Sequence, residues 1–316
     1  LTLNSGATIE NVIGGILNDT FTGNSLNNVL TGGTGNDTYA FDTDLALGTD
    51  TINESAGGTD TLNFSGTTTR NIAIDLSNAA AQVVNAGLTL NLSASNTMEN
   101  IIGGALNDTI TGNSQNNILI GGAGNDTYIL NTDLSLGSDT INEAGGGTDT
   151  LDFGATTTRG IIIDLSKTTA QVLNPGLTLT LTSGAAIENV TTGAMNDTLT
   201  GNSLNNILTG GAGNDIYFFD TDSAQGSDTI TETGTGIDTL NFSLTTTLAL
   251  TVDLSNASSQ VVNSGLTLTL SSDTAIENVV GGSLGDTFTG NSRPNLLTGG
   301  AGNDTYNFDT DLTLGA

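Results

Sequence analysis

The chain contains no cysteine, no histidine and no tryptophan among its 316 residues. Without cysteine, disulfide bonds and thiol chemistry are excluded. Without histidine, the chain lacks the Ser-His-Asp and Cys-His arrangements, the usual general base of enzymes and the common zinc sites. Metal ions and backbone hydrogen bonds remain as the cross-links that can hold the fold together.

Basic and aromatic residues are also scarce. Four lysine and arginine residues stand against 33 acidic ones, which gives a formal net charge of −29. So acidic a chain excludes nucleic acid and anionic membranes as partners. Aromatic residues make up only 4% of the chain, too few for an ordinary globular core. We therefore expect the chain to stay expanded until cations offset its self-repulsion.

What the chain has in abundance is repetition. The tetrapeptide (Ile/Met)-Glu-Asn-(Val/Ile) recurs every 89 residues, at Glu10, Glu99, Glu188 and Glu277. Because so strict a phase is typical of units that pack on their neighbours, we predict one continuous solenoid over residues 1–316. Its units are residues 1–89, 90–178, 179–267 and, incompletely, 268–316. Leu1 aligns with Leu90 and Ala316 with Thr49, so no capping sequence is present and we expect a fragment of a longer chain.

A shorter period lies inside each unit. Residues 14–40 are three nonapeptides in tandem, each predicting a six-residue turn and a three-residue strand. The large apolar residue of each strand is expected to point inward: Phe21, Leu30 and Tyr39. Two nonapeptides make one coil of 18 residues, so Asp19 and Asp37 should lie directly above one another. Stacked carboxylates of this kind require a cation.

The nonapeptide turns carry the residue types that calcium requires. Glycine at the first, second and fourth positions allows positive φ and lets backbone carbonyls turn toward one point, which adds oxygen ligands to the aspartate. One such turn could equally be a solvated Gly/Asn/Asp turn, but constant spacing favours metal. The predicted ligands are Asp19, Asp37, Asp108, Asp126, Asp197, Asp215, Asp286 and Asp304. The glycines that shape these sites are Gly14, Gly32, Gly33, Gly35, Gly103, Gly121, Gly122, Gly124, Gly210, Gly211, Gly213, Gly281, Gly299, Gly300 and Gly302.

The third nonapeptide recurs as Gly-Gly-x-Gly-Asn-Asp-x-Tyr at residues 32–39, 121–128, 210–217 and 299–306. In this motif the chain resembles the RTX family of haemolysin-type calcium-binding repeats. The resemblance implies a parallel β-roll with several calcium ions between coils, and type I secretion through a C-terminal signal. The middle nonapeptide departs from the family pattern, because it has asparagine where the family has aspartate: Asn28, Asn117, Asn206 and Asn295. Whether that opposite edge binds metal stays open.

The second half of each unit contains further acidic turns and alternating apolar residues. A second tier of calcium ligands is predicted at Asp50, Asp60, Asp139, Asp149, Asp228 and Asp238, with Glu54, Glu143 and Glu232 recurring beside them. Solvated turn acids would give the same pattern. Residues 71–76, 82–84 and 88–92 predict half-buried strands. The predicted fold is therefore an all-β parallel β-roll or β-solenoid with essentially no helix, at roughly 18 residues and 4.8 Å per coil.

The repeat also bears on catalysis. Every notable acid recurs with the 89-residue period, whereas an active site is normally a single constellation in a pocket. We therefore expect no enzymatic activity. The four basic residues do not recur in every unit, so we interpret them as surface variation: Arg70, Arg159, Lys167 and Arg293.

Three functions fit these patterns. The first is a secreted structural repeat at the cell surface, an adhesin extender, stalk or filament that folds on binding calcium outside the cell. The second is a secretion and folding module of a secreted RTX enzyme. The third is an ice-binding or carbohydrate-binding face, which is weakened because Thr34 is replaced by alanine in later units. Partners expected are calcium ions and further copies of the chain in a filament or surface layer.

Overall fold

A computed structural model describes residues 9–54 and 57–308. These residues form strands and turns with no helix, which confirms the all-β prediction, and none of them could span a membrane as a helix. Leu1 and Ala316, on which the expectation of uncapped ends depends, lie outside the described residues. The chain divides into two compact units. The first contains Leu1–Leu130, Leu134–Leu151 and Pro175–Ala186, and the second contains Asn131–Asp133, Asp152–Asn174 and Ile187–Ala316.

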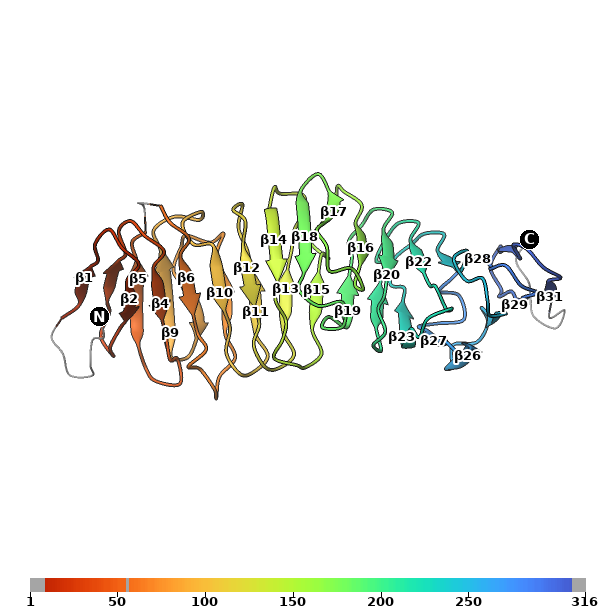
Figure 1. Cartoon of the computed structure of the whole chain (residues 1–316), viewed down its shortest axis with the longest axis horizontal. Helices are drawn as coiled ribbons and strands as arrows, with labels where there is room; N and C mark the ends of the chain where they lie inside the picture. The colour runs from red at the N-terminus through yellow and green to blue at the C-terminus, as the bar shows by residue number, and fades with distance from the viewer. Residues whose placement is uncertain (1–8, 55–56, 309–316) are drawn as a thin grey trace. The chain divides into compact units, whose positions relative to one another are not determined.

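The strands of the first unit stack in three runs (Figure 1). One run contains β1 (Asn11–Ile13), β3 (Val29–Thr31), β5 (Gly48–Ile52), β9 (Leu88–Leu92) and β8 (Gln82–Asn85). The second contains β2 (Thr20–Thr22), β4 (Thr38–Ala40), β6 (Thr61–Asn63), β10 (Asn100–Ile102), β12 (Ile118–Ile120), β14 (Gly137–Ile141) and β18 (Leu177–Leu181). The third contains β7 (Ala73–Asp75), β11 (Thr109–Thr111) and β13 (Thr127–Ile129).

The second unit repeats this arrangement. One run contains β16 (Ile162–Asp164), β20 (Thr198–Thr200), β22 (Ile216–Phe218), β24 (Thr239–Asn241), β28 (Asn278–Val280) and β30 (Leu296–Thr298). Another contains β19 (Asn189–Thr191), β21 (Ile207–Thr209), β23 (Gly226–Thr231), β27 (Leu266–Leu270) and β26 (Gln260–Asn263). The last contains β25 (Thr251–Asp253), β29 (Thr287–Thr289) and β31 (Thr305–Asn307). β15 (Thr150–Asp152) and β17 (Gln171–Asn174) complete the set of described strands.

The core is a column of single side chains, one from the middle of each short strand. β2 pairs in parallel with β4 one coil later, so that Phe21 lies opposite Tyr39. Their rings stack with centroids 5.3 Å apart, and both side chains are at most 2% exposed. Because side chains alternate along a strand, the flanking threonines face outward. The prediction that the large apolar residue of each nonapeptide points inward is confirmed.

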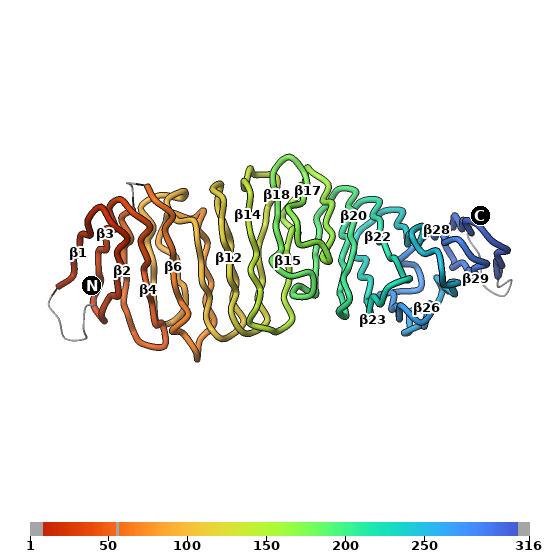
Figure 2. The backbone as a smooth tube through the Cα atoms, in the orientation of Figure 1, coloured from red at the N-terminus to blue at the C-terminus, as the bar shows by residue number. Residues whose placement is uncertain are grey.

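The predicted coil of 18 residues holds only for the nonapeptides. Backbone-to-carboxylate hydrogen bonds join Asp19 to Asp37 over 18 residues, but Asp37 to Asp60 over 23 and Asp60 to Glu99 over 39. The expectation of a uniform coil throughout the unit is therefore wrong, because the second half lacks the nonapeptide turns, each of which completes half a coil in nine residues. The tube in Figure 2 shows these longer excursions of the backbone after β4.

The longest coil contains an antiparallel hairpin that the sequence did not predict. β8 and β9 pair antiparallel with a register shift between Val83 and Asn85, and the Asn85 side chain accepts a hydrogen bond from the Gly87 amide across the turn. In consequence, β10, which corresponds to β1 one repeat later, joins the run of β2, β4 and β6. Successive repeats within the first unit thus place equivalent strands on opposite sides of the coil. In the second unit, the equivalent strands β19 and β28 likewise belong to different runs.

Candidate metal centre

The glycines of the third nonapeptide have two different functions. Gly33 and Gly35 adopt φ values of 103° and 131°, a conformation that side-chain-bearing residues rarely adopt. Gly32 is not among the glycines with a positive φ, but a Cβ at this position would lie 2.3 Å from both Asp37 Oδ2 and Glu54 Oε2. Gly32, the first glycine of the motif, is thus required because a side chain would collide with the carboxylates. The expectation that glycine allows a positive φ at all three positions is wrong for this one.

A ladder of carboxylates runs along one edge of the coils. Asp37 Oδ1 accepts a hydrogen bond from the Asp19 amide, and Asp60 Oδ1 accepts one from the Asp37 amide, both at 2.7 Å. The predicted stacking of Asp19 over Asp37 is therefore confirmed as geometry. The same ladder recurs from Asp108 to Asp126 and from Asp197 to Asp215.

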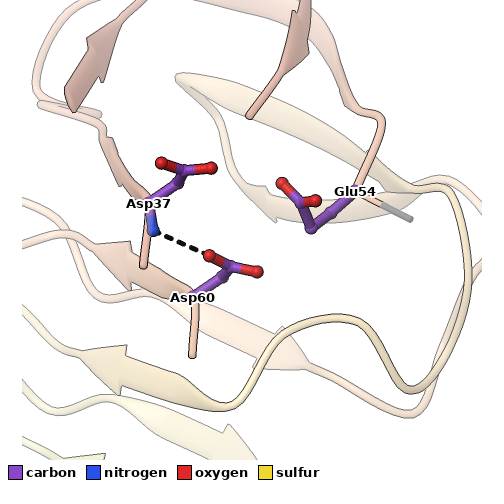
Figure 3. A group of neighbouring side chains, drawn as sticks. All are labelled: Asp37, Glu54 and Asp60. Atoms are coloured by element: carbon purple, nitrogen blue, oxygen red, sulfur yellow. Dashed lines mark hydrogen bonds between the residues drawn. The ribbon is translucent and has the colours of Figure 1, made fainter. Parts of the chain in front are cut away.

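Three carboxylates converge at the end of this ladder, as Figure 3 shows for Asp37, Glu54 and Asp60. One oxygen of each lies within 4.8 Å of the others, and the three residues are at most 2% exposed. Glu54 reaches the group from the turn after β5, while Asp37 and Asp60 precede β4 and β6. Equivalent clusters are formed by Asp126, Glu143 and Asp149, and by Asp215, Glu232 and Asp238.

A tyrosine hydroxyl closes each cluster from the core side. Tyr39 donates to Glu54 Oε2 at 2.7 Å, Tyr128 donates to Glu143 Oε2 at 2.5 Å, and Tyr217 donates to Glu232. Burial and the neighbouring glutamate raise the pKa of these tyrosines far above its ordinary value, so each remains a hydrogen-bond donor. Sequence reasoning missed this role, although tyrosine at position eight of every third nonapeptide was the available signal.

The clusters fit a cation because buried oxygens in them have no partner. Asp37 Oδ2, Asp126 Oδ2 and Asp215 Oδ2 are buried and accept no hydrogen bond. Burial, together with the charges of neighbouring carboxylates, raises the pKa of both Asp126 and Asp215 to about 7. Several buried carboxylates without a compensating charge are strongly unfavourable, and a hard divalent cation supplies that charge.

Not every predicted ligand enters a cluster. The carboxylate of Asp108 accepts hydrogen bonds from the Gly104 and Ile72 amides, and Asp286 is bound in the same way by Gly282 and Leu250. In the described part of the chain, no three-acid group includes a ligand predicted in the first nonapeptide of a unit: Asp19, Asp108, Asp197 or Asp286. Asp304, from a third nonapeptide, is likewise in none, and its Oδ1 accepts the Asp286 amide. Calcium binding by these five residues, as by the other predicted ligands, stays a prediction.

The opposite edge, where asparagine replaces aspartate, is built differently. The side-chain amide of Asn117 donates to the Glu99 carbonyl at 2.9 Å and to Asn113 Oδ1 at 3.1 Å, so an N–H₂ group lies between two oxygens. Asp139 Oδ1 accepts the Asn117 amide at 2.9 Å, while its Oδ2 is buried without a partner. Asp50 and Asp228 repeat this arrangement. Of the second tier, therefore, Asp60, Asp149 and Asp238 join the clusters, whereas Asp50, Asp139 and Asp228 do not.

Three of the four basic side chains have specific contacts, which corrects their interpretation as surface variation. Arg70 and Arg159 are half-buried, and each donates from Nη1 to a backbone carbonyl at 2.6 Å, that of Thr43 and Thr132 respectively. Arg293 forms an ion pair with Glu277.

Two family comparisons match most of the described chain. The RTX calcium-binding nonapeptide repeat matches residues 13–44, 94–131 and 280–311. The serralysin C-terminal region of M10 peptidases matches residues 139–264. No curated protein sequence matches the chain well enough to count as a relative. Residues 13–44, 94–131 and 280–311 are thus RTX calcium-binding nonapeptide repeats, the fold is the parallel β-roll of those repeats, and the metal is calcium.

Proposed function

We propose that this chain is a calcium-dependent extracellular structural repeat, a stiff stalk or adhesin extender that folds on binding calcium after secretion. The observation that carries the proposal is the recurrence of buried, unpartnered carboxylate oxygens at Asp37, Asp126 and Asp215. Each lies beside two further acids, so each of these three repeats needs cations to be stable. The same set of acids is distributed along the chain instead of being gathered into one active site.

Calcium concentration explains where folding would take place. Sites typical of extracellular modules dissociate at roughly 10⁻⁴ to 10⁻³ M, so they are empty in the cytosol and fill outside the cell. A chain with a net charge of −29 and a thin core would then remain expanded during export. The matches to RTX repeats and to a serralysin C-terminal region support secretion of the type I kind.

Circular dichroism of the chain with and without calcium tests the dependence on metal. At pH 8, where the buried carboxyls are ionised, we expect a strand spectrum in millimolar calcium and a largely disordered one in chelator. The four tyrosines, in a chain without tryptophan, give a second signal, since three of them donate to cluster glutamates. A strand spectrum that is unchanged by chelator would contradict the proposal.

Single-molecule pulling tests the mechanical part of the proposal. An 89-residue repeat that unfolds as one step would lengthen the chain by about 300 Å, at roughly 3.4 Å per extended residue. A stalk requires that calcium raise the force of each step. Equal forces in calcium and in chelator would count against a load-bearing role, even if calcium is bound.

A secretion and folding module of a secreted enzyme is the second candidate, and the match of residues 139–264 to a serralysin C-terminal region favours it. The two functions differ in their effect on an attached domain. A folding module should make the refolding of a fused passenger calcium-dependent, whereas an extender should leave the passenger's refolding rate unchanged.

Association of several chains into a filament or surface layer is part of the extender hypothesis. Sedimentation velocity in millimolar calcium tests it, because lateral association gives species larger than the monomer. A purely monomeric profile at high protein concentration would exclude the filament while leaving the single-chain stalk.

A further inference from the structure

The middle nonapeptide of each repeat carries a pair of asparagines that the third nonapeptide lacks. Asparagine stands at positions two and six, where the third nonapeptide has glycine and aspartate. In the second repeat these residues are Asn113 and Asn117. The equivalent pairs are Asn24 and Asn28, Asn202 and Asn206, and Asn291 and Asn295. We name each such pair an asparagine clasp.

Every side-chain nitrogen and oxygen of the second clasp has a hydrogen-bond partner. The amide nitrogen of Asn117 donates to the Glu99 carbonyl at 2.9 Å and to Asn113 Oδ1 at 3.1 Å. The amide nitrogen of Asn113 donates to the Met98 carbonyl at 2.7 Å. In return, Asn117 Oδ1 accepts the Asn113 backbone amide at 2.8 Å, and Asn113 Oδ1 accepts that of Gln115 at 2.9 Å. The clasp therefore ties its turn to the preceding coil through amide hydrogens.

The same contacts recur along the chain. The amide at position two donates to the carbonyl 15 residues earlier in all four clasps, those of Ile9, Met98, Ile187 and Ile276. The amide at position six donates to the carbonyl of the tetrapeptide glutamate in the last three clasps, those of Glu99, Glu188 and Glu277. The clasp is therefore a property of the repeat and not of one place in the chain.

The backbone of the middle turn also differs from that of the third nonapeptide. Gly122 and Gly124 adopt φ values of 104° and 114°, which lets the carbonyls of that turn face one point. No residue of a middle nonapeptide is among the described residues with a positive φ. The middle turn is thus closed by side-chain amides, without the left-handed glycines of the third nonapeptide.

Asp139, beside the second clasp, and Asp126, on the opposite edge, form a matched pair of buried carboxyl groups. Each is 1% exposed, and in each Oδ1 accepts one backbone amide while Oδ2 has no partner. Asp126 lies in a cluster with Glu143 and Asp149, whereas no three-acid group in the described part of the chain includes Asp139. A single buried carboxyl is neutralised by one proton, but three together need a cation.

We propose that the asparagine clasp takes the place of an ion on its edge of the coils, so that calcium binds on the aspartate edge alone. The clasp amides donate to carbonyl oxygens that a metal would need as ligands. This inference rests on the calcium-dependent function proposed above and confines the ion to one edge. Asp50, Asp139 and Asp228 then belong to the fold and are not calcium ligands.

The number of calcium ions bound per chain at pH 8 tests the proposal, measured by equilibrium dialysis of the full chain with elemental analysis. Asp126→Asn removes a cluster carboxylate and should lower the count by one. Asp139→Asn removes an equally buried carboxylate and should leave the count unchanged. Asn117→Asp removes the donating amide and places a second carboxylate beside Asp139, so it should add one ion. Asn116→Asp, at the exposed neighbouring position, makes the same change in charge and should add none.

Circular dichroism in saturating calcium establishes that each variant is folded, and Asp50→Asn or Asn28→Asp, the equivalent changes in the first repeat, replace a variant that does not fold. An unchanged count in Asp139→Asn together with a gain in Asn117→Asp supports the proposal. Loss of an ion in Asp139→Asn, or no gain in folded Asn117→Asp, overturns it and leaves the calcium-dependent function intact. A wild-type chain that binds no calcium would instead overturn the proposed function itself.

Discussion

Without calcium, this protein should be more stable in weak acid than at slightly alkaline pH. The prediction depends on three buried carboxyl groups outside the clusters, those of Asp50, Asp139 and Asp228, which are at most 1% exposed. In each, Oδ1 accepts one backbone amide and Oδ2 has no partner. Burial raises the pKa of each group from 3.8 to about 7.

The sign and size follow from linkage between proton binding and folding. A folded-state pKa above the unfolded value means that the folded chain holds the proton more tightly. The resulting stability is fully present below about pH 4 and is lost as pH rises through about 7. At about 1.4 kcal/mol per pKa unit, deprotonation between pH 5 and pH 8 costs roughly 3 kcal/mol for each carboxyl. That is a large share of the roughly 5–15 kcal/mol by which a domain is stable.

Urea denaturation in chelator, from pH 5 up to the pH at which the chain loses its strand spectrum, followed by tyrosine fluorescence, measures the effect. Asp139→Asn should weaken the pH dependence by about the share of one carboxyl, since an amide does not titrate in this range. Asp273→Asn, at an exposed position, makes the same change in net charge and should leave the dependence unchanged. A wild-type protein whose stability is flat or rises between pH 5 and pH 8, or an Asp139→Asn variant with the full pH dependence, would refute the reasoning.

Three further substitutions test individual contacts. Gly121→Ala introduces a Cβ 2.6 Å from Glu143 Oε2, so it should weaken calcium binding at least about tenfold, or about 1.4 kcal/mol, as measured by calorimetry. Gly15→Ala is the control, because a Cβ at Gly15 meets no atom closer than 4.0 Å and should leave calcium binding unchanged. Asn117→Asp replaces a donating amide by an acceptor beside two oxygens and should cost about 1–3 kcal/mol in chelator at pH 5, where the calcium-free chain is most stable; an unchanged urea midpoint would contradict the role of that amide. Tyr128→Phe removes the hydrogen-bond donor to Glu143 and should cost a similar amount in chelator at pH 5; a variant with the thermal stability of the wild type would contradict this role.

The nonapeptide half of the repeat could be predicted because it closes a coil in a fixed number of residues. With that spacing, Asp19 and Asp37 could be placed one above the other before any coordinates were known. The inward direction of Phe21 and Tyr39 followed from strand alternation alone. Local rules were sufficient wherever two nine-residue repeats of the sequence make one coil.

The composition of the clusters could not be predicted in the same way. Asp60 lies 23 residues after Asp37 and 39 before Glu99, distances that match no multiple of nine. Glu54 enters the cluster only because the turn after β5 directs it there, and a recurring acid in a turn is equally consistent with solvation. The β8–β9 hairpin depends on pairing across Asn85 and Gly87, which has no counterpart in the nonapeptides.

The alternation of sides between successive repeats has a consequence for recognition. In the first unit, β2 and its counterpart β11 belong to different runs of strands, so the motif around Phe21 and that around Ile110 do not share one surface. A receptor or neighbouring filament that touched a single flank of this unit would meet the motif around Phe21 without meeting its counterpart in the next repeat. Avidity along one flank of this unit would therefore gain nothing from the second copy of the motif.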